Sequence, residues 1–274
     1  MLTLAYDGTD FQGWQVQPGL PTVQGELQAA LGRVTGESPL PQGSGRTDAG
    51  VHALAQVASF PLAAPIPPEN LLRALNRTLP SSIRISKTST ARSAFHARHS
   101  AVAKTYEYRL LLAHDCSPFL ARYVSACPWP LSFETLQAAA RLFVGEHDFA
   151  SFAATDPDRA HRILAEEEEP EDLDATRSTP AAVKAGSIRT ILESTWEQRS
   201  TDAGELLVYR VRGNGFLHHM VRNLVGTMID VARGQLALED IPRILAARSR
   251  SEAGPTAPAR GLFLHSVDYP PEDL

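Results

Sequence analysis

The chain has few of the features that mark secreted, membrane-spanning or zinc-binding proteins. Its 274 residues include two cysteines, Cys116 and Cys127, which are too few for a disulfide framework and lack the paired spacing of a zinc site. No run of about 18 apolar residues predicts a transmembrane helix. The first residues also lack the basic region and apolar stretch of a secretory signal. We therefore expect a cytoplasmic protein with reduced thiols and no membrane association.

The chain also lacks the short motifs of several enzyme classes. It contains no G-x-x-x-x-G-K-[ST] loop, no G-x-S-x-G elbow and no H-E-x-x-H motif. The stretch GSGRTD ends in Asp48, where a dinucleotide-binding loop would carry a glycine. Two histidine pairs have no third metal ligand near them in sequence: His96 with His99, and His218 with His219. The familiar catalytic motifs and a dinucleotide-binding loop are therefore excluded, and neither histidine pair predicts a metal site.

Negative charge is concentrated in one segment of the chain. The formal net charge is −5, from 26 lysine and arginine residues and 31 aspartate and glutamate residues. Seven of the acids lie between Glu166 and Asp174, which leaves 24 acids against 26 bases elsewhere. The surrounding segment, about 156–186, has few large apolar residues, so we expect it to be a disordered insertion. Basic residues cluster around Arg98 and Lys104 and in the stretch 209–223, so a surface that binds nucleic acid is compatible with the acidic total.

Apolar periodicity predicts two successive units that each mix strands with helices. Alternating or β-rich runs predict strands at 2–6, 51–60, 82–89, 104–112, 187–197, 205–213 and 262–269. Helical spacing predicts helices at 23–34, 68–80, 134–145 and 216–232. This order favours an α+β fold in which a ferredoxin-like pattern of antiparallel strands occurs twice. We place the boundary near Ser100, with domains at 1–99 and 100–274.

The stretch GRTDAGVHA, which begins at Gly45, raises the question of whether Asp48 does chemistry. A glycine-bounded loop tolerates an aspartate, so Asp48 taken alone is typical of a turn. The turn does not account for Arg46, which lies two residues earlier.

Here a resemblance to a known family adds to the argument. GRTDAGVHA resembles the signature of the TruA-type tRNA pseudouridine synthases. Further stretches similar to that family follow in order along almost the whole chain: YDGTDFQGWQ, FHARHSAVAKTYEY, GEHDFASF, IRTI, NGFLHHMVRNLVG and APARGLFLHSVDYP. The resemblance implies isomerisation of uridine to pseudouridine without a cofactor, within two ferredoxin-like (RRM-like) domains that join in a continuous antiparallel sheet and have the active site in the cleft between them.

The resemblance also implies roles for particular residues. It makes Asp48 the catalytic residue, which either attacks the sugar or promotes a glycal intermediate. It places Tyr106 beside the target base as a candidate for removing the proton from C5, and it pairs Arg222 with Asp48. Arg46 is implied to displace the target base from its stack, which agrees with the stacking of guanidinium groups on RNA bases. His52, in the same signature, is expected to contact the substrate.

The helix predicted at 216–232 is compatible with this role for Arg222. Its apolar residues recur at helical spacing, and Arg222 projects from the flank of the apolar stripe. Such a helix can pack on a core while its guanidinium reaches a cleft. Without the resemblance, Arg222 would be interpreted as a solvated helix arginine.

The resemblance further implies a homodimer that acts on the anticodon arm of tRNA, at positions 38, 39 and 40. Recognition of neighbouring positions implies that RNA shape is read more than base sequence. Two alternatives from other classes remain open. One is a non-catalytic RNA-binding module with RRM-like domains, although no aromatic RNP1-like strand is evident. The other is a carboxylate-dependent nucleoside glycosidase, although no second carboxylate is evident.

Overall fold

The computed structural model describes residues 1–154 and 186–271. Helices and strands alternate along these residues, in agreement with the predicted α+β fold. The strands are β1 (Leu2–Tyr6), β2 (Gln42–Gly43), β3 (His52–Ser59), β4 (Ile83–Thr88), β5 (Ala103–Leu112), β6 (Ser125–Cys127), β7 (Gly145–Asp148), β8 (Ile188–Thr201), β9 (Gly204–Gly213) and β10 (Leu262–Asp268). The helices are α1 (Val23–Thr35), α2 (Pro68–Thr78), α3 (Phe133–Arg141), α5 (Met220–Ala232) and α6 (Asp240–Ala247), with short 3-10 turns at Ala150–Phe152, Arg250–Glu252 and Ala259–Gly261. The predicted insertion at 156–186 lies, apart from Gly186, outside the described residues.

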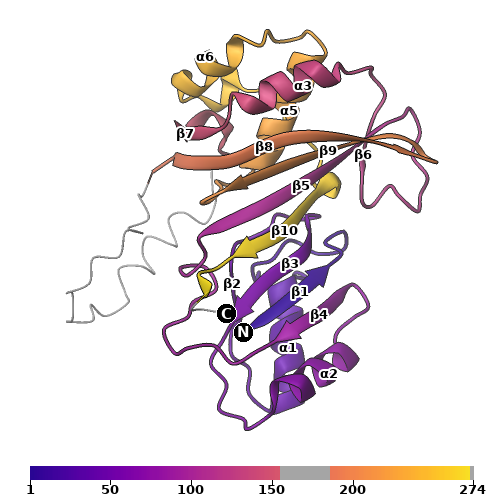
Figure 1. Ribbon diagram of the computed structural model, residues 1–274. Helices are drawn as coiled ribbons and strands as arrows, with labels where there is room; N and C mark the ends of the chain where they lie inside the picture. Colours follow the sequence, from indigo (N-terminus) through magenta and orange to yellow (C-terminus); the bar gives the residue numbers. More distant parts are fainter. Residues whose placement is uncertain (155–185, 272–274) are drawn as a thin grey trace, which may run out of the picture.

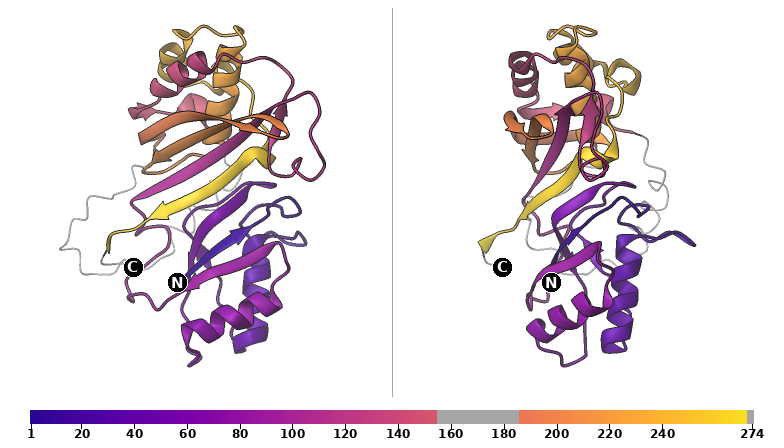
Figure 2. Two further views of the ribbon diagram at one scale, coloured as in Figure 1. Left: turned by 45° about the vertical axis from the view of Figure 1, so that its right-hand side comes forward. Right: turned by 90° about the vertical axis from the view of Figure 1, so that its right-hand side faces the viewer.

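Within the described residues, one ten-stranded sheet runs through the whole molecule in the order β4-β1-β3-β10-β5-β9-β8-β7, with β2 beside β3 and β6 beside β5 (Figure 1). The expectation of an antiparallel sheet is correct for most pairs and wrong for two. β10 pairs with β3 in parallel, and β6 pairs with β5 in parallel. β10 is the last strand of the chain, yet it lies between strands from the two halves of the sequence (Figure 2). A local periodicity gives no information about such a distant partner.

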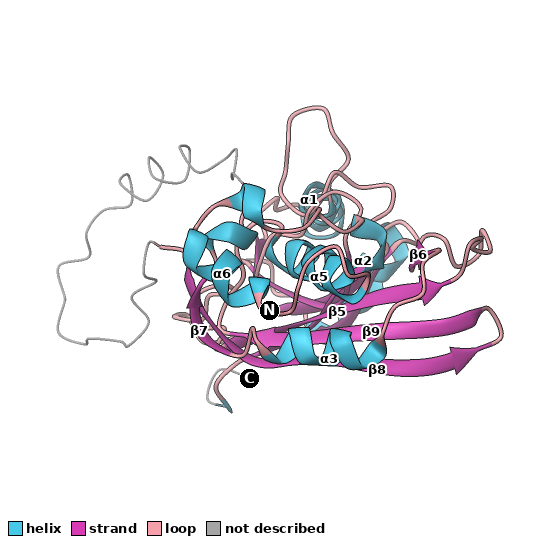
Figure 3. Cartoon of the chain, turned by 90° about the horizontal axis from the view of Figure 1, so that it is seen from above, coloured by secondary structure: helices cyan, strands magenta, loops and turns pink. Residues whose placement is uncertain are grey.

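The helices gather at the two ends of the sheet. In Figure 1, α1 and α2 lie at the lower end, and α3, α5 and α6 lie at the upper end. Seen from above, β5, β9 and β8 run alongside one another, with α5 and α6 on one side of them (Figure 3). Among the residues that the structure describes, no helix has both the length and the apolar character needed to cross a membrane.

Capping explains where two of the predicted helices begin or end. The Thr22 side chain accepts a hydrogen bond from the backbone of Gly25, and Gly36 ends α1 with a left-handed φ of 77°. The helix predicted at 134–145 is shorter in the structure, where α3 ends at Arg141. Gly145 cannot continue it, because this residue has a φ of 113° and begins β7.

The long helix predicted at 216–232 begins later than expected, at Met220. His219 precedes it with a φ of 59° and a ψ of 2°, in the left-handed region that non-glycine residues rarely occupy. Phe216 to His219 therefore form a non-helical entry to α5. The sequence did not predict this non-helical entry, because apolar residues continue at helical spacing through Phe216 to His219.

Candidate active site

The loop that carries Asp48 is held by buried polar side chains. Ser44 Oγ donates to Gln56 Oε1 at 2.6 Å, and Gln56 Nε2 donates to the carbonyl oxygen of Gly45 at 2.8 Å. The hydroxyls of Tyr6 and Thr47 lie 2.8 Å apart in a further hydrogen bond. Ser44 and Gln56 are completely buried. Because buried polar groups are costly to leave unpaired, these bonds restrict the loop to one conformation.

A neighbouring turn packs its backbone directly against the Asp48 loop. Trp14 donates its backbone N–H to the carbonyl oxygen of Thr47 at 3.0 Å. Gly13 has a φ of 83°, and a Cβ atom there would lie 2.5 Å from the same oxygen. Only glycine satisfies both conditions, because it tolerates positive φ and leaves room for the backbone. This explains why the glycine of FQGW is needed for a site that lies more than thirty residues later in the sequence.

Asp48 is surrounded by three basic side chains from the second half of the chain. Arg222 Nη1 donates to Asp48 Oδ2 at 3.1 Å, and the exposed fractions of the two side chains are 15% and 20%. Arg222 Nε donates to the carbonyl oxygen of Ala257 at 2.7 Å, which orients the guanidinium. The Nε2 atoms of His218 and His219 lie 3.5 Å and 3.4 Å from the Asp48 carboxylate. The carboxylate is therefore partly withdrawn from water and held by a permanent cation.

The left-handed conformation of His219 contributes directly to this arrangement. It ends the segment that enters α5 and brings the ring beside that of His218, at a centroid distance of 4.0 Å. Burial lowers the pKa of His219, while the neighbouring Asp48 carboxylate acts to raise it. A left-handed non-glycine residue costs about 1–2 kcal/mol, so the surrounding contacts must maintain it.

Asp48 opens into a cavity of ≈550 Å³ that is lined by both halves of the chain. The volume lies within the range of small-ligand sites. Arg46, Thr47 and Gly45 line it from the loop before β3, and Gln12 and Trp14 line it from the preceding turn. The second half contributes these lining residues: Lys104, Tyr106, Phe216, Leu217, His218, His219, Met220, Val221 and Leu262.

Tyr106 and Phe216 form an aromatic wall of this cavity. Their rings meet edge to face, with centroids 5.0 Å apart and an interplanar angle of 78°. Burial raises the pKa of the Tyr106 hydroxyl well above its usual range, and the nearby Tyr6 and Asp48 act in the same direction. Tyr106 is therefore protonated at neutral pH and presents a neutral phenol to the cavity.

His52 is not among the residues that line the cavity, although the sequence signature contains it. Its side chain is 1% exposed. Gly8 donates its backbone N–H to His52 Nδ1 at 3.0 Å, so the proton lies on Nε2, which donates to the carbonyl oxygen of Arg122 at 2.8 Å. The ring stacks on Phe263 at 4.7 Å. The structure thus places His52 between the first turn, the loop that carries Arg122 and β10, away from direct contact with a ligand in the cavity.

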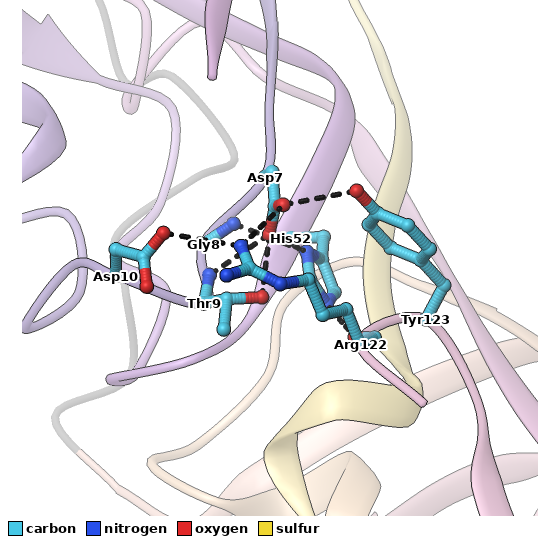
Figure 4. Close-up of polar contacts among 7 residues, drawn as sticks. All are labelled: Asp7, Gly8, Thr9, Asp10, His52, Arg122 and Tyr123. Carbon is cyan, nitrogen blue, oxygen red and sulfur yellow. Dashed lines mark hydrogen bonds and ion pairs between the residues drawn. The ribbon is translucent and has the colours of Figure 1, made fainter. Parts of the chain in front are cut away.

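A polar cluster surrounds His52, as Figure 4 shows. Asp7 Oδ1 lies 3.2 Å from His52 Nδ1, and Asp7 Oδ2 accepts a hydrogen bond from the Tyr123 hydroxyl at 3.0 Å. Arg122 reaches Asp10 at 3.1 Å and Asp7 at 3.4 Å. These contacts connect the turn that leads toward Gln12 and Trp14 with the loop after β5.

One set of residues at the site has the geometry to bind a divalent cation. Ligand atoms of Asp48, His218 and His219 lie within 4.8 Å of one another. Arg222 already contacts an oxygen of the same carboxylate, and its positive charge opposes a cation there. The arrangement therefore favours a carboxylate that is stabilised by the Arg222 guanidinium over one that binds a metal ion.

The structure brings together four of the five residues expected at the site: Asp48, Arg46, Tyr106 and Arg222. Sequence reasoning did not include Lys104 or Phe216 among them. Lys104 was detectable in principle, because it lies two residues before Tyr106 on a predicted strand and therefore on the same face. Phe216 was predicted only as the first residue of a helix, and the left-handed conformation of His219, which ends the non-helical entry to α5, has no sequence signal.

Comparison with known proteins gives consistent matches over most of the chain. A family model described as tRNA pseudouridine synthase matches residues 3–100 and 171–270. The chain is 49% identical over 267 residues to a protein of Solibacter usitatus named tRNA pseudouridine synthase A, and the match covers 97% of each chain. It is 42% identical to a protein of that name from Moorella thermoacetica and 39% identical to one from Lacticaseibacillus casei, with 98% of each chain covered in both matches.

Proposed function

The chain belongs to the tRNA pseudouridine synthase family and isomerises uridine to pseudouridine in tRNA, and we propose that Asp48 is the carboxylate that carries out this reaction. The observation that carries the proposal is the contact between Asp48 and Arg222 at the cavity. A partly buried carboxylate that faces a cavity and is held by a fixed cation has the geometry of a nucleophile or base.

The reaction requires little beyond such a carboxylate. The N1 to C1′ bond of uridine breaks, the base rotates, and a C5 to C1′ bond forms. The proton lost from C5 is balanced by the proton gained at N1, so atoms and charge are conserved without an external reactant. Asp48 either attacks C1′ to give a glycosyl ester or removes a proton from the sugar to give a glycal. Both routes need an ionised carboxylate and a site that retains the detached base.

Arg222 is proposed to orient the Asp48 carboxylate. Its guanidinium donates a charge-assisted hydrogen bond to Asp48 Oδ2 at 3.1 Å. The bond from Arg222 Nε to Ala257 limits movement of the guanidinium and so holds Asp48 Oδ2. Asp48 Oδ1, which lies 3.5 Å from His218 Nε2, is proposed to face the sugar.

Tyr106 and Arg46 are proposed to handle the base. Tyr106, with Phe216, offers an aromatic surface against which a uracil can pack. Because its hydroxyl is protonated, Tyr106 can accept the proton from C5 only if its own proton leaves at the same time. Arg46 lies two residues before Asp48 and lines the same cavity, which suits a guanidinium that displaces the target base from its stack.

The role proposed for His52 is positioning. Its bonds to Gly8 and Arg122 hold the first turn, and that turn supports the Asp48 loop through Gly13 and Trp14. Loss of His52 would therefore affect the substrate through the placement of the loop.

We also propose that the fold consists of two ferredoxin-like domains, 1–99 and 100–274. Strand order supports this division, because β4-β1-β3-β2 in the first half corresponds to β10-β5-β9-β8 in the second half. In both sets, two strands that are connected through a helix have another strand of the set between them in the sheet. This is the split β-α-β pattern of that fold. β2 has only two residues and pairs with the end of β3, while β10 pairs with its beginning. The short β2 thus leaves an open edge at which the second domain joins the sheet.

The proposed substrate site is the anticodon arm of tRNA at positions 38, 39 and 40, and the proposed active form is a cytoplasmic homodimer. Family membership supports these proposals. Mapping of pseudouridine in tRNA after incubation with the protein tests the positions, and sedimentation at micromolar concentration tests the dimer. A non-catalytic RNA-binding module would give no pseudouridine in this assay. A nucleoside glycosidase would release free uracil instead.

A further inference from the structure

We propose that Lys104, Arg98 and Arg189 form a site for one backbone phosphate next to the target uridine. The proposal rests on the function given above, because it places an RNA strand in the cavity. It assigns a task to the basic cluster around Arg98 and Lys104, which the chemistry of Asp48 does not use.

Lys104 lies at the cavity that holds Asp48. It precedes Tyr106 by two residues on β5, so both side chains leave the same face of the sheet, roughly 7 Å apart along the strand. That distance is on the scale of one nucleotide. Lys104 Nζ donates to the carbonyl oxygen of Ser44 at 2.5 Å, and an ammonium group has three donors. A Cβ atom at Gly45 would lie 3.2 Å from Nζ, so the glycine leaves room for the ammonium group at the cavity wall.

Two guanidinium groups lie close enough to Lys104 to affect its charge. Burial, with a smaller contribution from the positive charges of Arg98 and Arg189, lowers the pKa of Lys104 to about 8. Arg98 comes from the loop after β4 and lines the same cavity, while Arg189 comes from β8. Arg189 Nη1 is held by the carbonyl oxygens of Gly186 and Ile188 at 2.9 Å and 2.6 Å. Lys104 and Arg98 thus line one cavity from two separate segments, and the positive charge of Arg189 on β8 acts on both.

These cations have no acidic counterpart within residues 1–154 and 186–271, where none of the three forms an ion pair with a carboxylate. This distinguishes them from Arg210, Arg212 and Arg222, each of which pairs with an aspartate or glutamate. These like charges repel one another, and an anion bound beside Lys104 and Arg98 would reduce the repulsion. The anion that an RNA substrate brings to a site for its base and sugar is the adjoining phosphate.

A double-mutant cycle tests whether Lys104 contacts a phosphate. One change removes the negative charge of a phosphate in the RNA, and the other removes the positive charge of Lys104 in the protein. The substrate is an anticodon stem-loop RNA with one target uridine, prepared with the normal linkages or with a neutral methylphosphonate at the linkage 5′ or 3′ of that uridine. Binding is measured for the wild-type protein, Lys104→Gln and Lys104→Arg. Lys87→Gln is the matched control, because Lys87 is an exposed lysine on the edge strand β4 and does not line the cavity.

We expect one of the two methylphosphonates to weaken binding to the wild-type protein about tenfold, the loss of one charge-assisted hydrogen bond. Lys104→Gln should bind normal RNA about tenfold more weakly and show no further loss with that methylphosphonate. Lys104→Arg should restore most of the sensitivity, and Lys87→Gln should behave as the wild-type protein does. Arg98→Gln should reduce the sensitivity in part, and because its side chain is exposed the substitution should leave folding unchanged.

The phosphate site would be overturned if each methylphosphonate changed the RNA affinity of Lys104→Gln by the same factor as it changed that of the wild-type protein. The wild-type protein would still convert the normal RNA in that case, and the proposed function would stand. Failure of the wild-type protein to form pseudouridine in normal RNA would instead contradict the proposed function, so the two failures are distinguishable.

Discussion

Arg222 Nη1 lies 3.1 Å from Asp48 Oδ2, and 174 residues separate the two in the sequence. The contact joins the loop before β3 to the first turn of α5. It is the contact on which the proposed chemistry depends, because it combines partial burial with a permanent positive charge.

Replacement of Arg222 by lysine should reduce turnover at least about tenfold while tRNA affinity changes little. A lysine has a single ammonium group and cannot reproduce the separate bonds from Nη1 to Asp48 and from Nε to Ala257. The loss of a charge-assisted bond of this type corresponds to about 1.5–3 kcal/mol. Single-turnover rates and filter binding measure the two effects separately. Unchanged rates in Arg222→Lys would show that the pair does not support the chemistry.

Replacement of Gly13 by alanine should reduce both stability and turnover. The substitution places a Cβ atom 2.5 Å from the carbonyl oxygen of Thr47 and also strains a φ of 83°. Gly19→Ala is the matched control, because Gly19 has a similar φ of 72° with no atom within 4 Å of its Cβ position. Gly19→Ala should cost only the conformational strain of about 1–2 kcal/mol and leave turnover intact. Thermal melting and single-turnover assays of both variants provide the comparison, and equal effects of the two would contradict the packing argument.

His52 should make stability depend on pH. Burial lowers its pKa from the usual 6.5, and Asp7 opposes this shift only in part. The folded protein therefore holds His52 neutral, with Nδ1 as the acceptor for Gly8. The neutral form contributes its full stabilisation above about pH 6.5, the pKa of histidine in the unfolded chain. This stabilisation is lost as the pH falls from there through the lower pKa of His52 in the folded state. The stability advantage of the wild-type protein over His52→Gln should therefore shrink on acidification below pH 6.5, as melting curves would show. An advantage that grows at low pH would contradict the neutral form.

Lys104 should make RNA affinity fall as the pH rises through about 8, the value to which burial and the two arginines lower its pKa. Above that value the free site loses a positive charge, so a phosphate is attracted less strongly. Lys104→Arg should remove this dependence, because a guanidinium stays protonated throughout the range. Titration of binding between pH 7 and pH 9.5 in both proteins measures the effect. An equal fall in both would assign it to another group.

Local patterns in the sequence predict most elements of this fold. Strands such as β3 and β5 have alternating or β-rich runs, and α1 has both an N-terminal cap at Thr22 and a C-terminal glycine. The position of β10 was not predictable, because its pairing with β3 depends on how the halves of the chain meet. The start of α5 was also mispredicted, since strain at His219 is maintained by tertiary contacts that leave the apolar periodicity unchanged.

For the site, the signature around Asp48 identified the loop, and the structure shows which of the expected residues reach its cavity. His52 illustrates the difference, because membership of a sequence motif does not distinguish a residue that lines a cavity from one that holds the loop behind it. Lys104 shows the opposite case, because it lies outside the motif and far from Asp48 in sequence but lines the same cavity.

The most direct test of the account is pseudouridine formation by Asp48→Asn in a single-turnover assay with tRNA. Asparagine keeps nearly the same size and can accept a hydrogen bond from Arg222, but it lacks the anionic oxygen needed for nucleophilic or elimination chemistry. We expect no detectable pseudouridine. Affinity for tRNA should be unchanged or slightly higher, since a negative charge near the RNA backbone has been removed. Formation of pseudouridine at a rate close to that of the wild-type protein would contradict the catalytic role of Asp48.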